Sequence, residues 1–134
     1  MGKKFVAHRN DEVANDAKFD GRRKEAAGIV HYSSGKVLLI KRGSKSATYP
    51  DTWAFPGGKI DKDESPLQAA SRESFEEVGY SPSSALSIGA INSAGVKFHS
   101  FFSKGPQFDV NINDESSDYG WFDTSKLLTP IILS

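Results

Sequence analysis

The chain has 134 residues, with 17 Lys and Arg balanced by 17 Asp and Glu, and it contains no Cys. This length fits one domain with a single core, and the absence of Cys excludes disulfide frameworks, thiolate zinc sites and cysteine nucleophiles. A net charge of zero argues against electrostatic wrapping of nucleic acid, so we expect no nucleic-acid polymer as a partner. No apolar run approaches the ~20 residues that span a bilayer, and the N-terminus lacks the apolar centre of a signal peptide. We therefore expect a cytoplasmic protein without a membrane partner.

The two ends of the chain differ in residue composition from its middle. Residues 1–24 carry more basic than acidic side chains and only scattered apolar positions, which is typical of an irregular or flexible N-terminal arm. The domain is therefore predicted to span residues 25–134. Its last residues, 129–134, form a short apolar tail that docks either on the core or on a second subunit, so a homodimer stays an open option.

Apolar patterning predicts more strands than helices. Ser33-Ser34-Gly35 separates two β-prone runs and indicates a hairpin, while Pro56-Gly57-Gly58 breaks the chain after Trp53-Ala54-Phe55. Residues 111–118 are expected to form a polar, acidic loop. The predicted strands are, in chain order, 26–32, 36–42, 86–93, 96–103 and 119–122.

The clearest predicted helix covers residues 66–78. Ser65 is its N-cap, and Pro66 occupies the first helical position, where the missing N–H has no cost. Gln68 completes a capping box with Ser65, and Gly79 is placed to end the helix in a left-handed turn. Both ends of this helix are therefore defined by the sequence.

Three carboxylates on this helix, those of Glu73, Glu76 and Glu77, fall within an arc of about 100°. Their like-charge pairs each cost about 0.2–0.5 kcal/mol, and Glu76 and Glu77 also oppose the helix dipole in the last turn. Arg72 offsets part of this repulsion through Glu76. A solvated acidic face is the plain alternative, but bound cations would relieve the remaining repulsion. Clustered carboxylates favour Mg²⁺, or Mn²⁺, over zinc.

The same projection predicts which face of the helix packs on a sheet. The side opposite the acids is expected to be the core face, and Ala69 and Ala70 are expected to leave an open surface beside the carboxylates. The predicted packing residues are Leu67, Ser71, Ser74, Phe75 and Val78.

The spacing of residues from Gly58 to Tyr80 resembles the signature box of the Nudix hydrolases. That box has seven fixed positions, and all seven match. The resemblance extends over roughly residues 25–128, with departures at Ser74 and Tyr80, where the pattern has bulky aliphatic residues that pack. The matching residues are Gly58, Glu64, Arg72, Glu73, Glu76, Glu77 and Gly79.

The resemblance implies a metal site on the helix. Glu73, Glu76 and Glu77 would bind divalent cations together with the backbone carbonyl of Gly57. Water would then attack phosphorus while the metal ions neutralise charge on the phosphate oxygens.

Further roles follow from the same resemblance. Arg72 and Glu64 would hold the loop and the helix in register. Glu73 is the first choice for the general base. Glu115, in the loop before the last predicted strand, is the second candidate for a base or an extra metal ligand, with a plain solvated acid as its alternative.

The resemblance also implies an α/β fold of the α/β/α sandwich type around a mixed β-sheet. It implies a Mg²⁺-dependent hydrolase that cleaves the diphosphate linkage of a nucleoside diphosphate derivative, a small nucleotide-type substrate. One alternative is a pyrophosphohydrolase of oxidised nucleoside triphosphates, suggested by residues 53–59. Another is a non-catalytic, nucleotide-binding regulatory domain, although such a domain would not need three mutually repelling acids.

Substrate contacts are defined less sharply. Arg42 ends a predicted strand beside the loop and could clamp a phosphate with two hydrogen bonds, and Lys59 lies close to the metal loop in sequence. An ordinary surface cation is the alternative for Arg42. His31 and His99 have no second ligand at metal spacing, so we interpret both as structural residues.

Overall fold

The computed structural model describes most of the predicted domain and little of the predicted arm. The arm, residues 1–24, therefore lies almost wholly outside the described residues, and so does most of the apolar tail. The residues described are 18, 21, 24–47, 49–127 and 132–133.

The five predicted strands and the helix occur in the predicted order, with small differences in length. Three further short strands, at 53–55, 57–59 and 132–133, were not predicted, and the second of them includes two residues of the predicted break. The hairpin is confirmed as β1 (Glu25–Ser33) and β2 (Lys36–Arg42). β7 begins at residue 116, three residues before the predicted strand, because the end of the acidic loop already pairs with β2. The other elements are β3 (Trp53–Phe55), β4 (Gly57–Lys59), α2 (Pro66–Val78), β5 (Leu86–Ser93), β6 (Val96–Lys104), β7 (Ser116–Asp123), the 3-10 helix η1 (Thr124–Lys126) and β8 (Ile132–Leu133).

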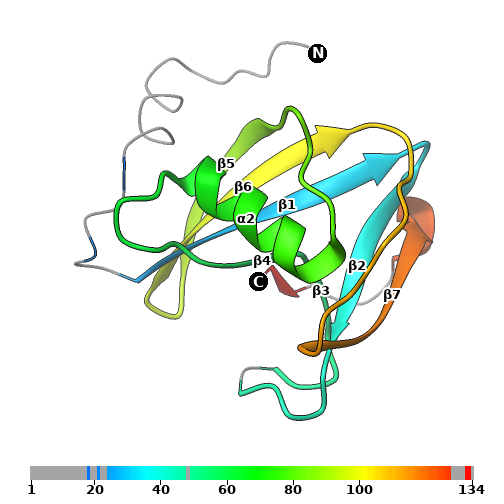
Figure 1. The fold of residues 1–134 in the computed structure, drawn as a ribbon, viewed down its shortest axis with the longest axis horizontal. Coiled ribbons are helices and arrows are strands. Elements are labelled where there is room, and N and C mark those ends of the chain that lie inside the picture. Colours follow the sequence, from blue (N-terminus) through cyan, green and yellow to red (C-terminus); the bar gives the residue numbers. More distant parts are fainter. Residues whose placement is uncertain (1–17, 19–20, 22–23, 48, 128–131, 134) are drawn as a thin grey trace.

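These eight strands form one mixed sheet around β1 and β2 (Figure 1). β1 runs parallel to β6 over eight residue pairs but pairs with β2 only next to the turn. Because the two hairpin strands then diverge, β4 pairs with the first half of β1, while β3 and β7 pair with β2. The loop between β3 and β4 is thereby fixed to the middle of β1, where the Ile29 N–H donates to the carbonyl of Pro56 at 3.0 Å. The predicted α/β class with a mixed sheet is confirmed.

The helix begins and ends where its caps predict. The Ser65 side chain accepts the Gln68 N–H at 3.1 Å, and the Gln68 side chain accepts the Ser65 N–H at 2.8 Å. Gly79 ends α2 in the left-handed region, with φ of +79°. These three residues confirm the capping prediction.

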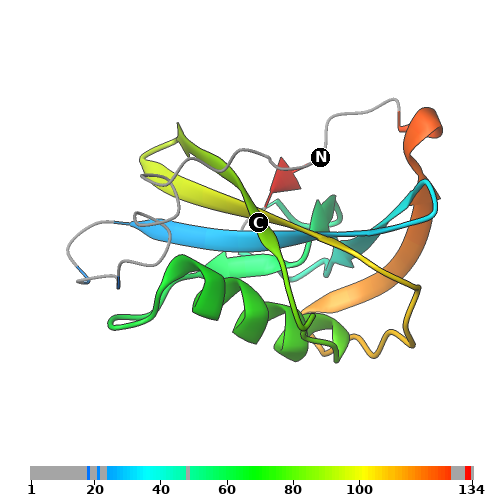
Figure 2. The ribbon, with the colours of Figure 1, turned by 90° about the horizontal axis from the view of Figure 1, so that it is seen from above.

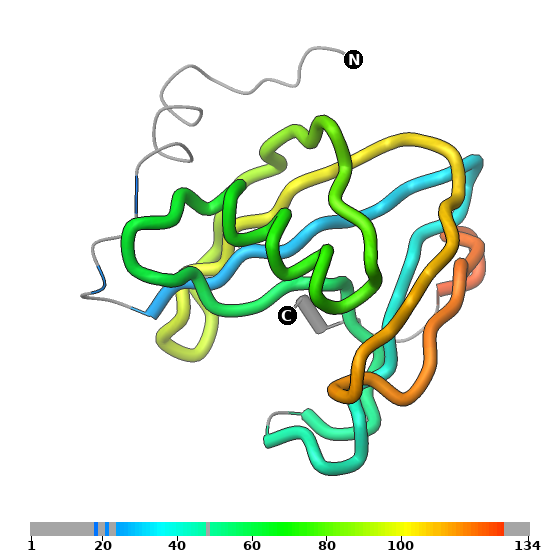
Figure 3. The backbone as a smooth tube through the Cα atoms, viewed as in Figure 1, coloured from blue at the N-terminus to red at the C-terminus, as the bar shows by residue number. Residues whose placement is uncertain are grey.

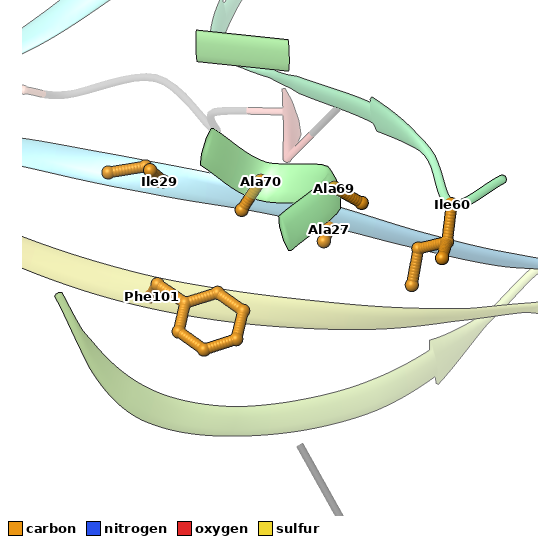
Figure 4. Packing of buried hydrophobic residues seen from close by; sticks show 6 residues of the cluster. All are labelled: Ala27, Ile29, Ile60, Ala69, Ala70 and Phe101. Atoms are coloured by element: carbon orange, nitrogen blue, oxygen red, sulfur yellow. The ribbon is translucent and has the colours of Figure 1, made fainter. Parts of the chain in front are cut away.

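The helix face that packs on the sheet is only partly the one expected: Ser74 and Val78 are fully buried as predicted, but the buried face also includes Ala69 and Ala70 and leaves out Phe75. α2 crosses one face of the sheet (Figure 2), and Ala69 and Ala70 are fully buried there against Ala27 and Ile29 of β1 (Figure 4). The expectation that the two alanines leave an open surface is wrong, and so is the burial expected for Phe75, whose side chain is 63% exposed. The small alanines let the helix approach the sheet closely, and this rotation also carries Glu73 and Glu77 inward.

Ser74, one of the two departures from the family pattern, is buried through hydrogen bonds. Its hydroxyl donates to the carbonyl of Tyr80 at 2.5 Å, so the ring nitrogen Nε2 of His31 must donate to the hydroxyl, at 2.9 Å. The Tyr80 ring, the second departure, stacks on Phe108 with centroids 3.9 Å apart. A polar contact and an aromatic stack therefore seat the end of the helix in place of two aliphatic side chains.

His99 also has a partner in the fold. Its ring nitrogen Nε2 lies 2.8 Å from a carboxylate oxygen of Glu25. Both histidines thus make contacts within the fold, as expected from the sequence. Within the described ranges, no helix combines the length and the apolar character needed to cross a lipid bilayer.

Candidate active site

The acidic side of α2 lies against the first two residues of β4, Gly57 and Gly58. The Gly57 N–H donates to the Glu77 carboxylate at 2.8 Å. At Gly58 a Cβ atom would fall 2.6 Å from the carboxylate carbon of Glu73, so the missing side chain makes room for that carboxylate. The glycine pair therefore lets two acids of the helix come into contact with the backbone of a strand.

Arg72 connects the long loop after β4 to the helix. Its guanidinium binds both carboxylate oxygens of Glu64, at 2.7 and 3.0 Å, and donates to the carbonyl of Lys59 at 3.0 Å. The same group contacts Glu73 at 2.9 Å. Through these contacts Arg72 links Lys59 and Glu64 of the loop to Glu73 of the helix.

The three helix acids do not share one environment. Glu73 is 15% exposed and belongs to the buried side of the helix, whereas Glu76 is 51% exposed and lies 3.4 Å from Arg72. The predicted compensation of Glu76 by Arg72 is therefore present in the structure. Arg72 contacts Glu73 and Glu76, so Glu77 is the helix carboxylate whose negative charge Arg72 does not compensate.

Burial dominates the electrostatics of the inner pair. It raises the pKa of Glu77 to about 8 against the opposing hydrogen bond from the Gly57 N–H. The charges of Glu73 and Glu115 reinforce this rise, and the charge of Arg42 opposes it. Burial also raises the pKa of Glu73, which the hydrogen bond from Arg72 opposes. By contrast, the hydrogen bonds from Arg72 lower the pKa of Glu64. An inner pair that resists ionisation is an environment that a nearby positive charge would stabilise.

A cleft of about 620 Å³ opens beside Glu77. Its walls come from the end of β2, the loop that follows β2, and the segment before β7, which meet near the end of α2 (Figure 3). Arg42 and Glu115 line it together with Glu77, and the Nε atom of Arg42 is buried without a hydrogen-bond partner among the described residues. The cleft is therefore lined by one cationic side chain together with two acidic ones.

The residues present fit a hard divalent cation in chemistry. In the part of the chain that the structure describes, no three Asp, Glu or His side chains converge closely enough to form a complete metal cage. Glu73 and Glu77 nevertheless offer buried carboxylate oxygens with unfavourable charge, and Glu115 faces the same cleft. Oxygen donors of this kind suit Mg²⁺ or Mn²⁺.

The structure brings together most, but not all, of the predicted site residues. Glu64, Arg72 and Glu73 form one connected group, and Glu77 joins it to Arg42 and Glu115 through the cleft. Lys59 is exposed, and it is not among the described residues that line the cleft, although its carbonyl binds Arg72.

Several cleft residues were not predicted from the sequence. They come from the loop after β2, for which the sequence predicts only a polar loop, and from the segment that ends the acidic loop and begins β7. The polarity of both segments was visible in the sequence, but their convergence depends on the pairing of β2 with β7. These residues are Ser44, Lys45, Ser46, Asp114, Ser116 and Ser117.

The glycine, arginine and glutamate residues that build this site are those of the signature box found in the sequence. The sequence profile of the NUDIX domain matches residues 22–132, most of the chain, and the chain belongs to that family. Proteins of this family generally use divalent metal ions.

Individual relatives agree with this assignment. An RNA pyrophosphohydrolase of Halorhodospira halophila is 38% identical over 71 residues, covering 53% of this chain and 36% of the relative. An RNA pyrophosphohydrolase of Pasteurella multocida is 44% identical over 64 residues, covering 48% and 30%. The chain thus spans about a third of the length of these curated relatives. The crystal structure of a MutT NUDIX hydrolase from Burkholderia pseudomallei superposes with a TM-score of 0.70 at 27% identity, covering 81% of this chain and 89% of that one.

Proposed function

We propose that this protein is a Mg²⁺-dependent hydrolase of phosphoric anhydride bonds that cleaves the diphosphate linkage of a nucleoside diphosphate derivative. The observation that carries the proposal is the buried acid pair, Glu73 and Glu77, beside a cleft that also contains Arg42 and Glu115. Membership of the NUDIX domain family and the pyrophosphohydrolase names of relatives support the reaction class.

Glu73, Glu76 and Glu77, with the carbonyl of Gly57 and the carboxylate of Glu115, would hold divalent cations. Bound there, the ions would neutralise charge on the bridging and leaving phosphate oxygens. The chain's own residues then have separate tasks. Arg72 keeps Glu73 and the loop in register, and its position supports this task because it contacts both Glu64 and Glu73.

The proposed reaction is an attack of water on phosphorus. A new P–O bond forms to the water oxygen, the bridging P–O bond breaks, and the leaving phosphate carries away the bonding electron pair. Glu73 accepts the proton of the water. Arg42 binds an anionic oxygen of the substrate, which would satisfy its unpartnered Nε donor. The products are a nucleoside monophosphate and a phosphorylated remainder.

Two alternative substrate classes are to be tested together with the nucleoside diphosphate derivatives. The relatives named RNA pyrophosphohydrolases favour an RNA with a 5′ phosphoanhydride as a second substrate class, against our expectation that no nucleic-acid polymer binds. An oxidised nucleoside triphosphate is the other enzymatic alternative. A cytoplasmic location and a homodimer remain predictions from the sequence.

The test is a substrate panel assayed with Mg²⁺ and with Mn²⁺, the products being identified by chromatography. We expect cleavage of at least one nucleoside diphosphate derivative and a loss of about 10²-fold or more in kcat for Glu73→Gln. Lys59→Gln is assayed beside it, and its rate reports whether the predicted contact of Lys59 with the substrate has any part in binding. Binding of nucleotides without product over hours would instead support the regulatory-domain alternative and reject the hydrolase.

A further inference from the structure

The segment before β7 contains an asparagine, Asn113, that joins two parts of the site. Its amide nitrogen donates to the backbone carbonyl of Glu76 at 3.0 Å, and its amide oxygen accepts the backbone N–H of Glu115, also at 3.0 Å. A carbonyl can only accept and an N–H can only donate, so the two partners together fix which way the amide faces. One side chain thus connects the last turn of α2 to Glu115.

The contact with Glu76 satisfies a group that the helix itself leaves free. The last four carbonyls of an α-helix have no partner within the helix, and the Glu76 carbonyl is one of them. Neighbouring groups are satisfied from the same segment, because the Asn111 N–H donates to the Val78 carbonyl at 2.9 Å. The segment before β7 is therefore attached to the end of the helix that carries Glu77.

Glu115 is held from its other side as well. Its carbonyl accepts the Gly43 N–H at 3.0 Å, and a turn closes between the Ser116 N–H and the Asn113 carbonyl at 3.2 Å. Gly43 directly follows Arg42, the last residue of β2. The backbone of Glu115 is thus held toward α2 on one side and by the residue that follows β2 on the other. Its charge is close enough to act on Glu77.

We propose that Asn113 is a positioning residue, which holds Glu115 beside Glu77 by anchoring the acidic segment to the end of α2. The inference rests on the proposed function, in which Glu115 supplies an extra metal ligand. Asn113 itself touches neither substrate nor ion. Without its amide, the segment keeps the Gly43 and Asn111 backbone contacts, but Glu115 loses the anchor on its own N–H.

The first test is a double-mutant cycle in kcat, using the full chain and saturating Mg²⁺. We expect Asn113→Ala to lower kcat roughly 10- to 100-fold, the range found when outer residues that orient metal ligands are removed, with an unchanged KM. Asn111→Ala is the matched control, because Asn111 is held through a backbone N–H that Ala keeps, and it should leave kcat unchanged. Both variants should melt within about 4 °C of the unsubstituted protein.

The cycle is completed by Glu115→Gln, which removes the carboxylate that Asn113 is proposed to position. We expect the double variant to be no slower than Glu115→Gln alone, because Asn113 acts only through Glu115. Additive losses would overturn the inference, since Asn113 would then act elsewhere. Unchanged kinetics of Asn113→Ala would overturn it as well. Both outcomes leave the hydrolase proposal intact, which depends on Glu73.

A second measurement decides the case if no diphosphate in the panel is cleaved. Mn²⁺ binding without substrate is followed by the electron paramagnetic resonance signal of the free ion. We expect Asn113→Ala to weaken Mn²⁺ binding roughly tenfold in the native background and not at all in the Glu115→Gln background. Equal Mn²⁺ affinities of Asn113→Ala and the unsubstituted protein would overturn the inference on this readout.

Discussion

Replacing Gly58 by alanine tests whether the close approach of Glu73 to the strand matters for the reaction. The new Cβ would lie 2.6 Å from the carboxylate carbon of Glu73 and within 2.8 Å of both its oxygens, whereas ordinary contact begins near 3.4 Å. The carboxylate must therefore retreat by roughly 0.8 Å. A misplacement of about 1 Å at a catalytic group can cost on the order of 10²-fold in rate, so we expect a loss of that size in kcat.

The same change should cost little stability. The atoms that obstruct the new Cβ are the far end of a flexible side chain, which can move without the backbone. Replacing Gly by Ala also lowers the entropy of the unfolded chain, which contributes about 0.4–1 kcal/mol in favour of the folded state. We expect the free energy of unfolding of Gly58→Ala to lie within about 1 kcal/mol of the native value.

Two further glycines provide controls for this pair of measurements. At Gly28 the new Cβ would lie 2.8 Å from the backbone carbonyl oxygen of Pro56, so Gly28→Ala should destabilise the fold by about 1–3 kcal/mol. At Gly105 nothing lies within 4 Å, so Gly105→Ala should change neither quantity. The assay is the hydrolysis rate at saturating substrate and Mg²⁺, with chemical denaturation on the same samples. Native turnover in Gly58→Ala would refute the placement of Glu73 in the reaction.

Three more outcomes follow from contacts in the fold. Arg72→Lys removes the planar guanidinium that binds both carboxylate oxygens of Glu64. We expect the free energy of unfolding to fall by about 1–2 kcal/mol and kcat to fall as well. Unchanged melting and turnover would contradict the proposal that Arg72 holds the loop and the helix in register. Phe75→Ser should shift the free energy of unfolding by no more than about 0.5 kcal/mol, because the ring is largely exposed. Ala70→Leu should lower it by about 1–3 kcal/mol in the same denaturation assay, because Ala70 is fully buried. A larger loss for Phe75→Ser than for Ala70→Leu would contradict the observed packing of the helix. Burial lowers the pKa of His31 to about 4, so the unfolded chain binds a proton first as the pH falls below 6.5, and stability should drop by up to about 3 kcal/mol between pH 6.5 and 4. His31→Gln should flatten that part of a denaturation series against pH, and parallel curves for both proteins would exclude His31 as the cause.

The local elements were predictable because their signals are local. The helix begins where the side chains of Ser65 and Gln68 form the capping box, and it ends where Gly79 can adopt the left-handed conformation. The hairpin likewise follows from a short turn between two β-prone runs. Such features depend on a few adjacent residues, and the fold does not override them.

The orientation of the helix could not be predicted in the same way. Periodicity places the packing face only roughly: Ser74 and Val78 are buried as predicted, but the bulk of Phe75 shifts the predicted face away from Ala69 and Ala70. Ala69 and Ala70 decide the matter, because small side chains allow the close packing that brings the acids to the glycine pair. Choosing a face by apolar bulk therefore misses a site built on close approach.

The residues that form the far wall of the cleft also could not be predicted from short stretches of sequence. Arg42 and Glu115 meet because β2 and β7 pair, although more than 70 residues separate them in the chain. A polar loop carries no sign of which strand it will lie beside. The role of Asn113 has the same origin, since it depends on two hydrogen bonds that only the folded chain brings within reach.

The central claim is that the crowded acids of α2 exist to hold divalent ions against a diphosphate. It is tested most directly by crystals grown with Mn²⁺ and a diphosphate whose bridging oxygen is replaced by a methylene group. The account predicts an anomalous manganese peak at coordinating distance from the carboxylates of Glu73 and Glu77, with the diphosphate in the cleft beside Arg42. A bound diphosphate with no manganese peak at those two carboxylates would contradict it.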